Sequence, residues 1–99
     1  MELTEAQKKH LRRLGHSLRP VVMMGQHGLT EAVIKETDRA LEDHELVKVR
    51  ARSGSRTERD AALAELALGT RSELVQRIGN VGLLYRKNNK LKKILLPDS

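Results

Sequence analysis

The chain has no cysteine and almost no aromatic side chains. Without cysteine it can form neither a disulfide nor a zinc site built on thiolates, and this composition fits a reducing compartment. Tyr85 is the single aromatic residue, which excludes the Phe and Tyr platform on which RNA-recognition motifs stack several bases. No apolar run approaches the roughly 20 residues that cross a bilayer, and residues 1–4 lack a secretory pattern. We therefore expect a cytoplasmic protein without a membrane partner.

Basic side chains outnumber acidic ones along the chain. Its 99 residues include 19 Lys and Arg against 13 Asp and Glu, which gives a formal net charge of +6. This length suits one domain, 1–99, with a single core and a basic C-terminal tail over about 87–99. An excess of positive charge favours an acidic polymer as partner over a small neutral substrate.

Hydrophobic periodicity and turn residues predict seven elements. The expected helices cover about 5–15, 30–43 and 61–68, the last capped by Thr57 and Asp60, and the expected strands cover 21–24, 46–52, 74–78 and 81–86. Gly79-Asn80 forms the turn of a terminal hairpin. The order helix, strand, helix, strand, helix, strand, strand indicates an α/β fold on a four-stranded mixed sheet. It leaves the order of the strands in the sheet open.

One loop carries the most specific local pattern. Gly25-Gln26-His27-Gly28 joins the first strand to a helix that Thr30 caps. Two glycines allow a tight turn and the close approach of a ligand, and the unpaired amides of the helix start favour an anion held over Gln26 and His27. The same spacing also suits a turn that serves the fold alone, so spacing by itself does not decide between the two interpretations.

Cations concentrate in two segments, which we interpret as phosphate contacts. The first helix and the linker after it contribute Lys8, Lys9, Arg12, Arg13 and Arg19. The second strand alternates apolar residues with Lys48, Arg50 and Arg52, and Arg56 follows it in a basic loop. Arg86 and Lys87, at the end of the hairpin, are further candidates. The second helix instead exposes mostly acidic residues, which repel phosphates.

The sequence offers little support for catalysis. Its four histidines lack metal-ligand spacing, and no nucleophile arrangement or Walker loop is present, so we expect no enzyme, metal or cofactor. A protein-interaction module, whose acidic second helix binds a basic partner, remains an alternative. Sequence-specific DNA binding is least favoured, because an acidic helix is a poor fit for the major groove.

Four blocks of sequence resemble one family. Residues 22–33, 46–49, 73–79 and 83–86 are similar to the CRM domain in its bacterial stand-alone YhbY-like form. The resemblance implies a non-catalytic RNA-binding domain, similar in fold to the C-terminal domain of translation initiation factor three, with its G-x-x-G loop at Gly25 to Gly28. The family loop often carries a lysine between the glycines. Gln26 and His27 stand here instead, so backbone amides would contribute more.

The same resemblance implies a place of action. Bacterial members of the family are associated with the precursor of the large ribosomal subunit, so the implied partners are its ribosomal RNA and also ribosomal proteins. A general RNA chaperone or a translation-associated factor is the alternative role. We expect the protein to be a monomer.

Overall fold

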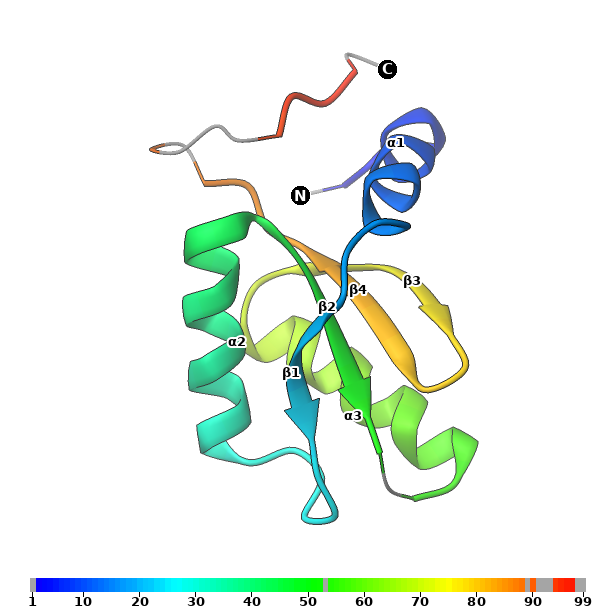
Figure 1. Ribbon diagram of the computed structural model, residues 1–99, viewed down its shortest axis with the longest axis vertical. Coiled ribbons are helices and arrows are strands. Elements are labelled where there is room, and N and C mark those ends of the chain that lie inside the picture. Colours follow the sequence, from blue (N-terminus) through cyan, green and yellow to red (C-terminus); the bar gives the residue numbers. More distant parts are fainter. Residues whose placement is uncertain (1, 53, 89, 91–93, 98–99) are drawn as a thin grey trace.

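The fold is one mixed sheet with helices on both of its faces. The computed structural model describes residues 2–52, 54–88, 90 and 94–97. The elements are α1 (Glu5–Gly15), β1 (Pro20–Met24), α2 (Glu31–His44), β2 (Leu46–Ala51), α3 (Arg56–Gly69), β3 (Glu73–Ile78) and β4 (Val81–Tyr85). The strands are ordered β1-β2-β4-β3 (Figure 1). This confirms the predicted α/β class and supplies the strand order. Of the predicted basic tail, residues 89, 91–93 and 98–99 lie outside the described residues.

The sheet contains one parallel pair, and this pair places two loops side by side. β1 runs parallel to β2, with Met24 opposite Ala51, whereas β4 is antiparallel to both of its neighbours. Parallel strands end at the same edge of a sheet. The loop after β1 and the loop after β2 therefore meet at one end of the molecule, at the bottom of Figure 1.

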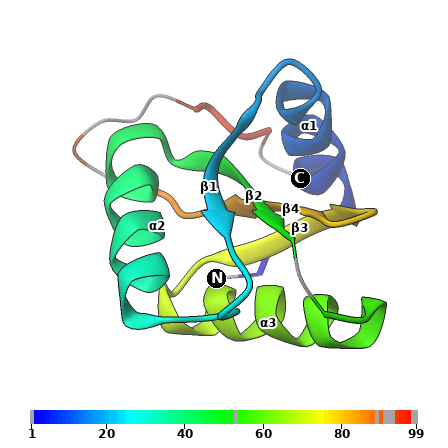
Figure 2. The same ribbon diagram turned by 60° about the horizontal axis from the view of Figure 1, so that its bottom comes forward.

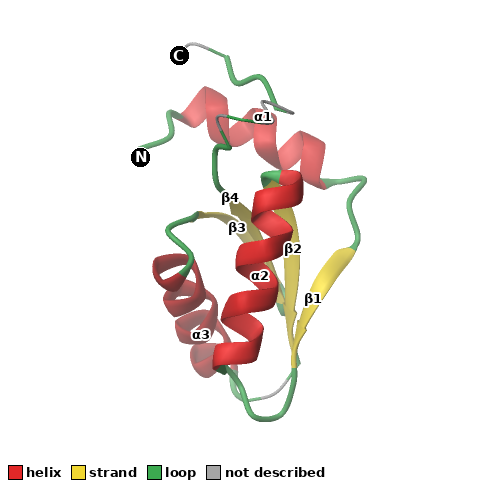
Figure 3. Cartoon of the chain, turned by 90° about the vertical axis from the view of Figure 1, so that its left-hand side faces the viewer, coloured by secondary structure: helices red, strands yellow, loops and turns green. Residues whose placement is uncertain are grey.

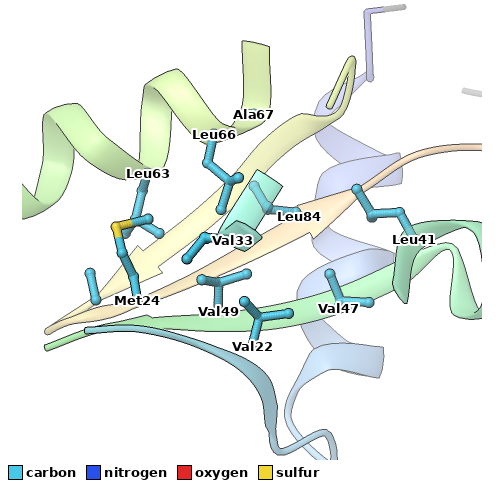
Figure 4. Packing of buried hydrophobic residues seen from close by; sticks show 11 residues of the cluster. Val22, Met24, Val33, Leu41, Val47, Val49, Leu63, Leu66, Ala67 and Leu84 are labelled. Atoms are coloured by element: carbon cyan, nitrogen blue, oxygen red, sulfur yellow. The ribbon is translucent and has the colours of Figure 1, made fainter. Parts of the chain in front are cut away.

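The main core lies between the sheet and the pair α2 and α3 (Figures 3 and 4). It is built from alternate strand residues and one stripe of each helix: Val22, Met24, Val47, Val49, Ala51 and Leu84 from the strands, and Val33, Leu41, Leu63, Leu66 and Ala67 from the helices. The predicted alternation of β2 is thus confirmed for Val47, Val49 and Ala51. None of the described helices has the length and apolar character that spanning a bilayer demands.

A second, smaller cluster lies on the opposite face of the sheet, beneath α1. It contains Leu3, Leu11, Leu46, Val75, Leu83 and Tyr85. A Cβ at Gly15 would lie 2.8 Å from Leu83 Cδ2, so glycine there allows the end of α1 to approach the sheet closely. Because α1 has 11 residues, it covers only one end of this face. Val21, Met23 and Ile78, toward the other end, stay exposed.

Capping side chains set the helix starts, and one prediction among them is wrong. Thr4 and Gln7 form the predicted capping box of α1, and the Thr30 hydroxyl accepts the Val33 N–H at 3.2 Å. The third helix begins earlier than predicted, because Ser55 and Glu58 form a complete capping box with bonds of 2.9 and 3.1 Å. Thr57 and Asp60 lie inside this helix, and Arg56, predicted in a loop, occupies its first turn.

A buried carboxylate ties the C-terminal segment to the sheet. Glu45 is fully buried after α2 and has φ of 65°. Its carboxylate accepts the N–H groups of Asn88 at 2.8 Å and Ile94 at 3.0 Å, and its carbonyl accepts the Arg86 N–H at 2.9 Å. These bonds give each oxygen of the buried carboxylate a donor. Burial, and then the charge of Glu45, raise the pKa of Tyr85.

Candidate nucleic-acid interface

The glycine loop is a single tight turn at the end of β1. The Gly28 N–H donates to the Gly25 carbonyl at 3.0 Å, and Gly28 has φ of 67°, a conformation that glycine adopts without strain. Gln26 and His27 lie exposed at the tip. A Cβ built on Gly25 or on Gly28 would meet no atom within 4 Å. Both glycines therefore border open space into which a ligand backbone fits.

A cleft of about 340 Å³ opens between this loop and α3. It is lined by Met24 and residues 25–28 on one side and by Ala51, Arg52, Gly54, Glu58, Arg59 and Ala62 on the other. The first turn of α2 does not line this cleft, so an anion held over Gln26 and His27 by the amides of this helix stays a prediction. The Thr30 hydroxyl already binds one of these amides, and the acidic Glu31 occupies the same turn. The parallel pairing of β1 and β2 brings α3 alongside the loop instead (Figure 2).

Two arginines and one carboxylate set the charge of this cleft, which we name the loop cleft. The Arg59 guanidinium donates to the Gly54 carbonyl at 2.9 Å. The pKa of Glu58 is lowered by hydrogen bonds from the Ser55 backbone and then from its side chain, so the carboxylate is ionised and used by the cap. Arg52 was predicted on the same strand face as Arg50. The structure instead places Arg52 after the end of β2, where it lines the loop cleft. Its backbone N–H donates to the Met24 carbonyl at 2.9 Å.

A second hollow lies on the part of the sheet that α1 leaves uncovered, and we name it the sheet groove. Its volume is about 250 Å³. Its lining comes from α1 and all four strands: Arg12, Gly15, His16, Pro20, Lys48, Arg50, Gln76, Ile78, Val81 and Leu83. Register places Lys48 and Gln76 on either side of Leu83, and Arg50 opposite Val81. No carboxylate belongs to this lining.

The remaining predicted cations of the N-terminal region lie around α1, on the same side of the sheet as the groove. Lys9, Arg13 and Arg19 are exposed, and Lys8 approaches Glu5 only at 3.9 Å, which leaves it a weak ion pair in water. Arg19 lines a further apolar hollow beside Leu18 and Val21. The cations of α1, of the linker after it and of the sheet groove thus lie on one side of the sheet, which we name the basic side.

Arg86 and Lys87 do not join this side. The Arg86 guanidinium bonds Asp38 at 2.6 Å and Glu42 at 2.9 Å, and it also donates to the Thr70 carbonyl at 2.8 Å. With 18% of its side chain exposed, it pins α2 to the end of β4 and is structural. Lys87 is exposed, but it follows β4 at the end of the sheet opposite the loop cleft.

Sequence reasoning left out Arg59 and Gln76, which line these two hollows. Lys48 was found beside Arg50 by the period of two along β2. Arg59 and Gln76 carried no comparable signal. Arg59 lies beside the loop because α3 begins after the Ser55 cap. Gln76 lies near Lys48 because β4 pairs with both β3 and β2, and the pairing with β2 does not follow from local sequence.

The fold and its surface define a small α/β domain that carries a glycine loop beside a cationic cleft. A model of the CRS1/YhbY (CRM) domain matches residues 3–86, so the chain belongs to the CRM domain family. This confirms the resemblance of the four sequence blocks.

Relatives match this chain along nearly their whole length. A Pseudomonas aeruginosa protein named probable RNA-binding protein is 50% identical over 95 residues, which are 96% of this chain and 91% of that one. An RNA-binding protein of Haemophilus influenzae is 40% identical, over 96% and 95% of the two chains. The solution structure of a Staphylococcus aureus protein matches with a TM-score of 0.84 and 38% identity, over 97% of this chain and 100% of that one.

Proposed function

We propose that this protein is a non-catalytic RNA-binding protein whose interface is the basic side of the sheet together with the loop cleft. The observation that carries the proposal is the segregation of charge across the sheet. Arg12, Lys48 and Arg50 gather on the side of α1 around a groove without a carboxylate. The helix α2, whose sequence is mostly acidic at its exposed positions, packs with α3 on the other face of the sheet (Figure 3). The CRM family and the RNA-binding names of the two relatives support it.

The two hollows suit different parts of an RNA backbone. At the loop cleft the glycines allow close approach, and Arg52 and Arg59 supply positive charge for a phosphate. Along the basic side, the cations of α1 and β2 contact further phosphates, a mode of binding that is independent of sequence. The competing interpretation, a protein interface on acidic α2, is weakened because Arg86 already binds Asp38 and Glu42.

Replacing Gly28 with Asp tests the loop cleft. The position tolerates the volume of a side chain, but its φ of 67° strains any residue with a Cβ. Gly28→Asn is the matched control, because Asn and Asp adopt the left-handed conformation with similar ease and differ by one charge. We expect the two variants to have similar melting temperatures, with RNA affinity about tenfold lower for Gly28→Asp, as loss of one charge-assisted contact predicts. Equal affinities of the two variants would show that the loop serves the fold alone.

We propose large-subunit assembly as the process in which this binding acts, with precursor ribosomal RNA as the target, ribosomal proteins as neighbours and the cytoplasm as the compartment. The support for this step is the similarity to bacterial YhbY-like proteins, since the geometry favours RNA in general. In a sucrose gradient of cell lysate, we expect the protein to sediment with large-subunit precursors and to leave those fractions after ribonuclease treatment. An even spread over free protein and translating ribosomes would favour a general RNA chaperone or a translation-associated factor.

A further inference from the structure

We propose that the sheet groove holds one unstacked nucleobase, so that the protein favours single-stranded segments of RNA over duplex. This inference rests on the proposed RNA binding and adds the class of RNA. Its first support is the floor of the groove. Ile78 and Val81 present an apolar surface beside the buried Leu83, and Ile78 is 64% exposed although five polar or charged residues line the same hollow.

The size of the groove limits what it holds. Pockets for drug-sized ligands span roughly 300 to 1,000 Å³, and the groove, at about 250 Å³, lies below that range. It therefore has room for one planar base and not for a whole helix. Tyr85 is buried under α1, so the base would stack on aliphatic side chains, on guanidinium planes and on the imidazole of His16, which lines the groove.

The polar rim matches a nucleotide in both charge and hydrogen bonding. Arg12, Lys48 and Arg50 surround the floor, and a base inside it would have its own phosphates within reach of these cations. The Gln76 amide offers two donors and an acceptor for a base edge. Among the described residues it makes no side-chain hydrogen bond that would occupy it. A peptide would need acidic side chains to match this rim, whereas every RNA segment brings phosphates.

A duplex cannot use this groove, because its bases are stacked and paired inside the helix. Single-stranded segments present bases that can be splayed out and read on their edges. The phosphate contacts of the basic side remain available to both forms. Preference for single strands should therefore depend on the groove, and overall affinity on the cations.

A double-mutant cycle tests the groove. The probes are a fluorescent single-stranded RNA of about ten nucleotides, the duplex with its complement, and single strands with one abasic nucleotide moved along the chain. We expect one abasic position to weaken binding by wild type about fivefold or more, as the loss of one stacked base predicts. Ile78→Ala should weaken single-strand binding by a similar factor, leave duplex binding unchanged, and remove the further effect of the abasic nucleotide.

Leu68→Ala is the matched control, since Leu68 is 81% exposed on α3, away from the groove. This variant should bind the single strand and the duplex with the affinity of wild type. If wild type binds both RNA forms equally and no abasic position matters, the groove proposal is wrong while RNA binding stands. If the losses of affinity caused by Ile78→Ala and by the abasic nucleotide are additive, the base lies elsewhere and the proposal is also overturned. Absence of binding to every probe would instead overturn the proposed function.

Discussion

Replacing Arg50 and Arg52 together with glutamate should lower RNA affinity by about a hundredfold or more. Arg50 lines the sheet groove and Arg52 lines the loop cleft, so the pair removes a cation from each half of the proposed interface and adds an anion in its place. Each charge-assisted hydrogen bond is worth about 1.5 to 3 kcal/mol, and two at the lower figure already give about a hundredfold. Fluorescence anisotropy with a structured RNA measures the change.

The fold should survive this double replacement. Arg50 lies on the face of β2 away from the main core, and Arg52 is exposed after the end of this strand, so the circular dichroism spectrum should be unchanged. Lys35→Glu with Arg39→Glu is the matched control. It makes the same change of net charge on the exposed face of α2, and the proposed orientation predicts little effect on affinity. Equal losses in the two double variants would mean that total charge matters and the position of the cations does not.

Affinity for structured RNA should fall on the order of a thousandfold between 50 and 200 mM salt. This estimate follows if about six phosphates are neutralised, because each releases counterions from the RNA. The basic side and the loop cleft carry enough cations for that number: Lys8, Lys9, Arg12, Arg13, Arg19, Lys48, Arg50, Arg52 and Arg59. A plot of the logarithm of affinity against the logarithm of salt concentration gives the number of phosphates directly.

The Arg50 and Arg52 double variant provides an internal control for the salt experiment. If both side chains contact phosphates, its slope should be lower than that of wild type by about two. A nearly flat dependence for wild type would contradict an interface based on phosphate contacts. That result would favour binding at the apolar hollow beside Leu18 and Val21 instead.

Local sequence patterns predicted the elements of this fold well wherever a single pattern dominated. Thr4 and Gln7 mark the start of α1 without a competitor, and the alternation of β2 places Val47 and Val49 inward. The third helix was mispredicted at its start because two caps competed. Ser55 with Glu58 forms the complete reciprocal box, whereas Asp60 instead pairs with Arg77 of β3.

These local patterns could not predict contacts between segments that are distant in the sequence. Arg86 appeared to be a free cation at the end of a hairpin, yet α2 supplies two carboxylates that bind it. Glu45 continued the acidic stretch of α2 and gave no sign that it would be buried against residues 88 and 94. The loop itself was predicted correctly as a turn, but its neighbour is α3, because the parallel pairing of β1 and β2 decides what lies beside it.

The orientation of RNA on the protein is the central claim, and mapping of amide resonances tests it most directly. Titrating isotope-labelled protein with a structured RNA should shift resonances of the second half of α1, of residues 25–28, of β2 and of the first turn of α3. Resonances of the exposed face of α2 should stay in place. Large shifts confined to α2, with none at the glycine loop or along Lys48 and Arg50, would contradict the account.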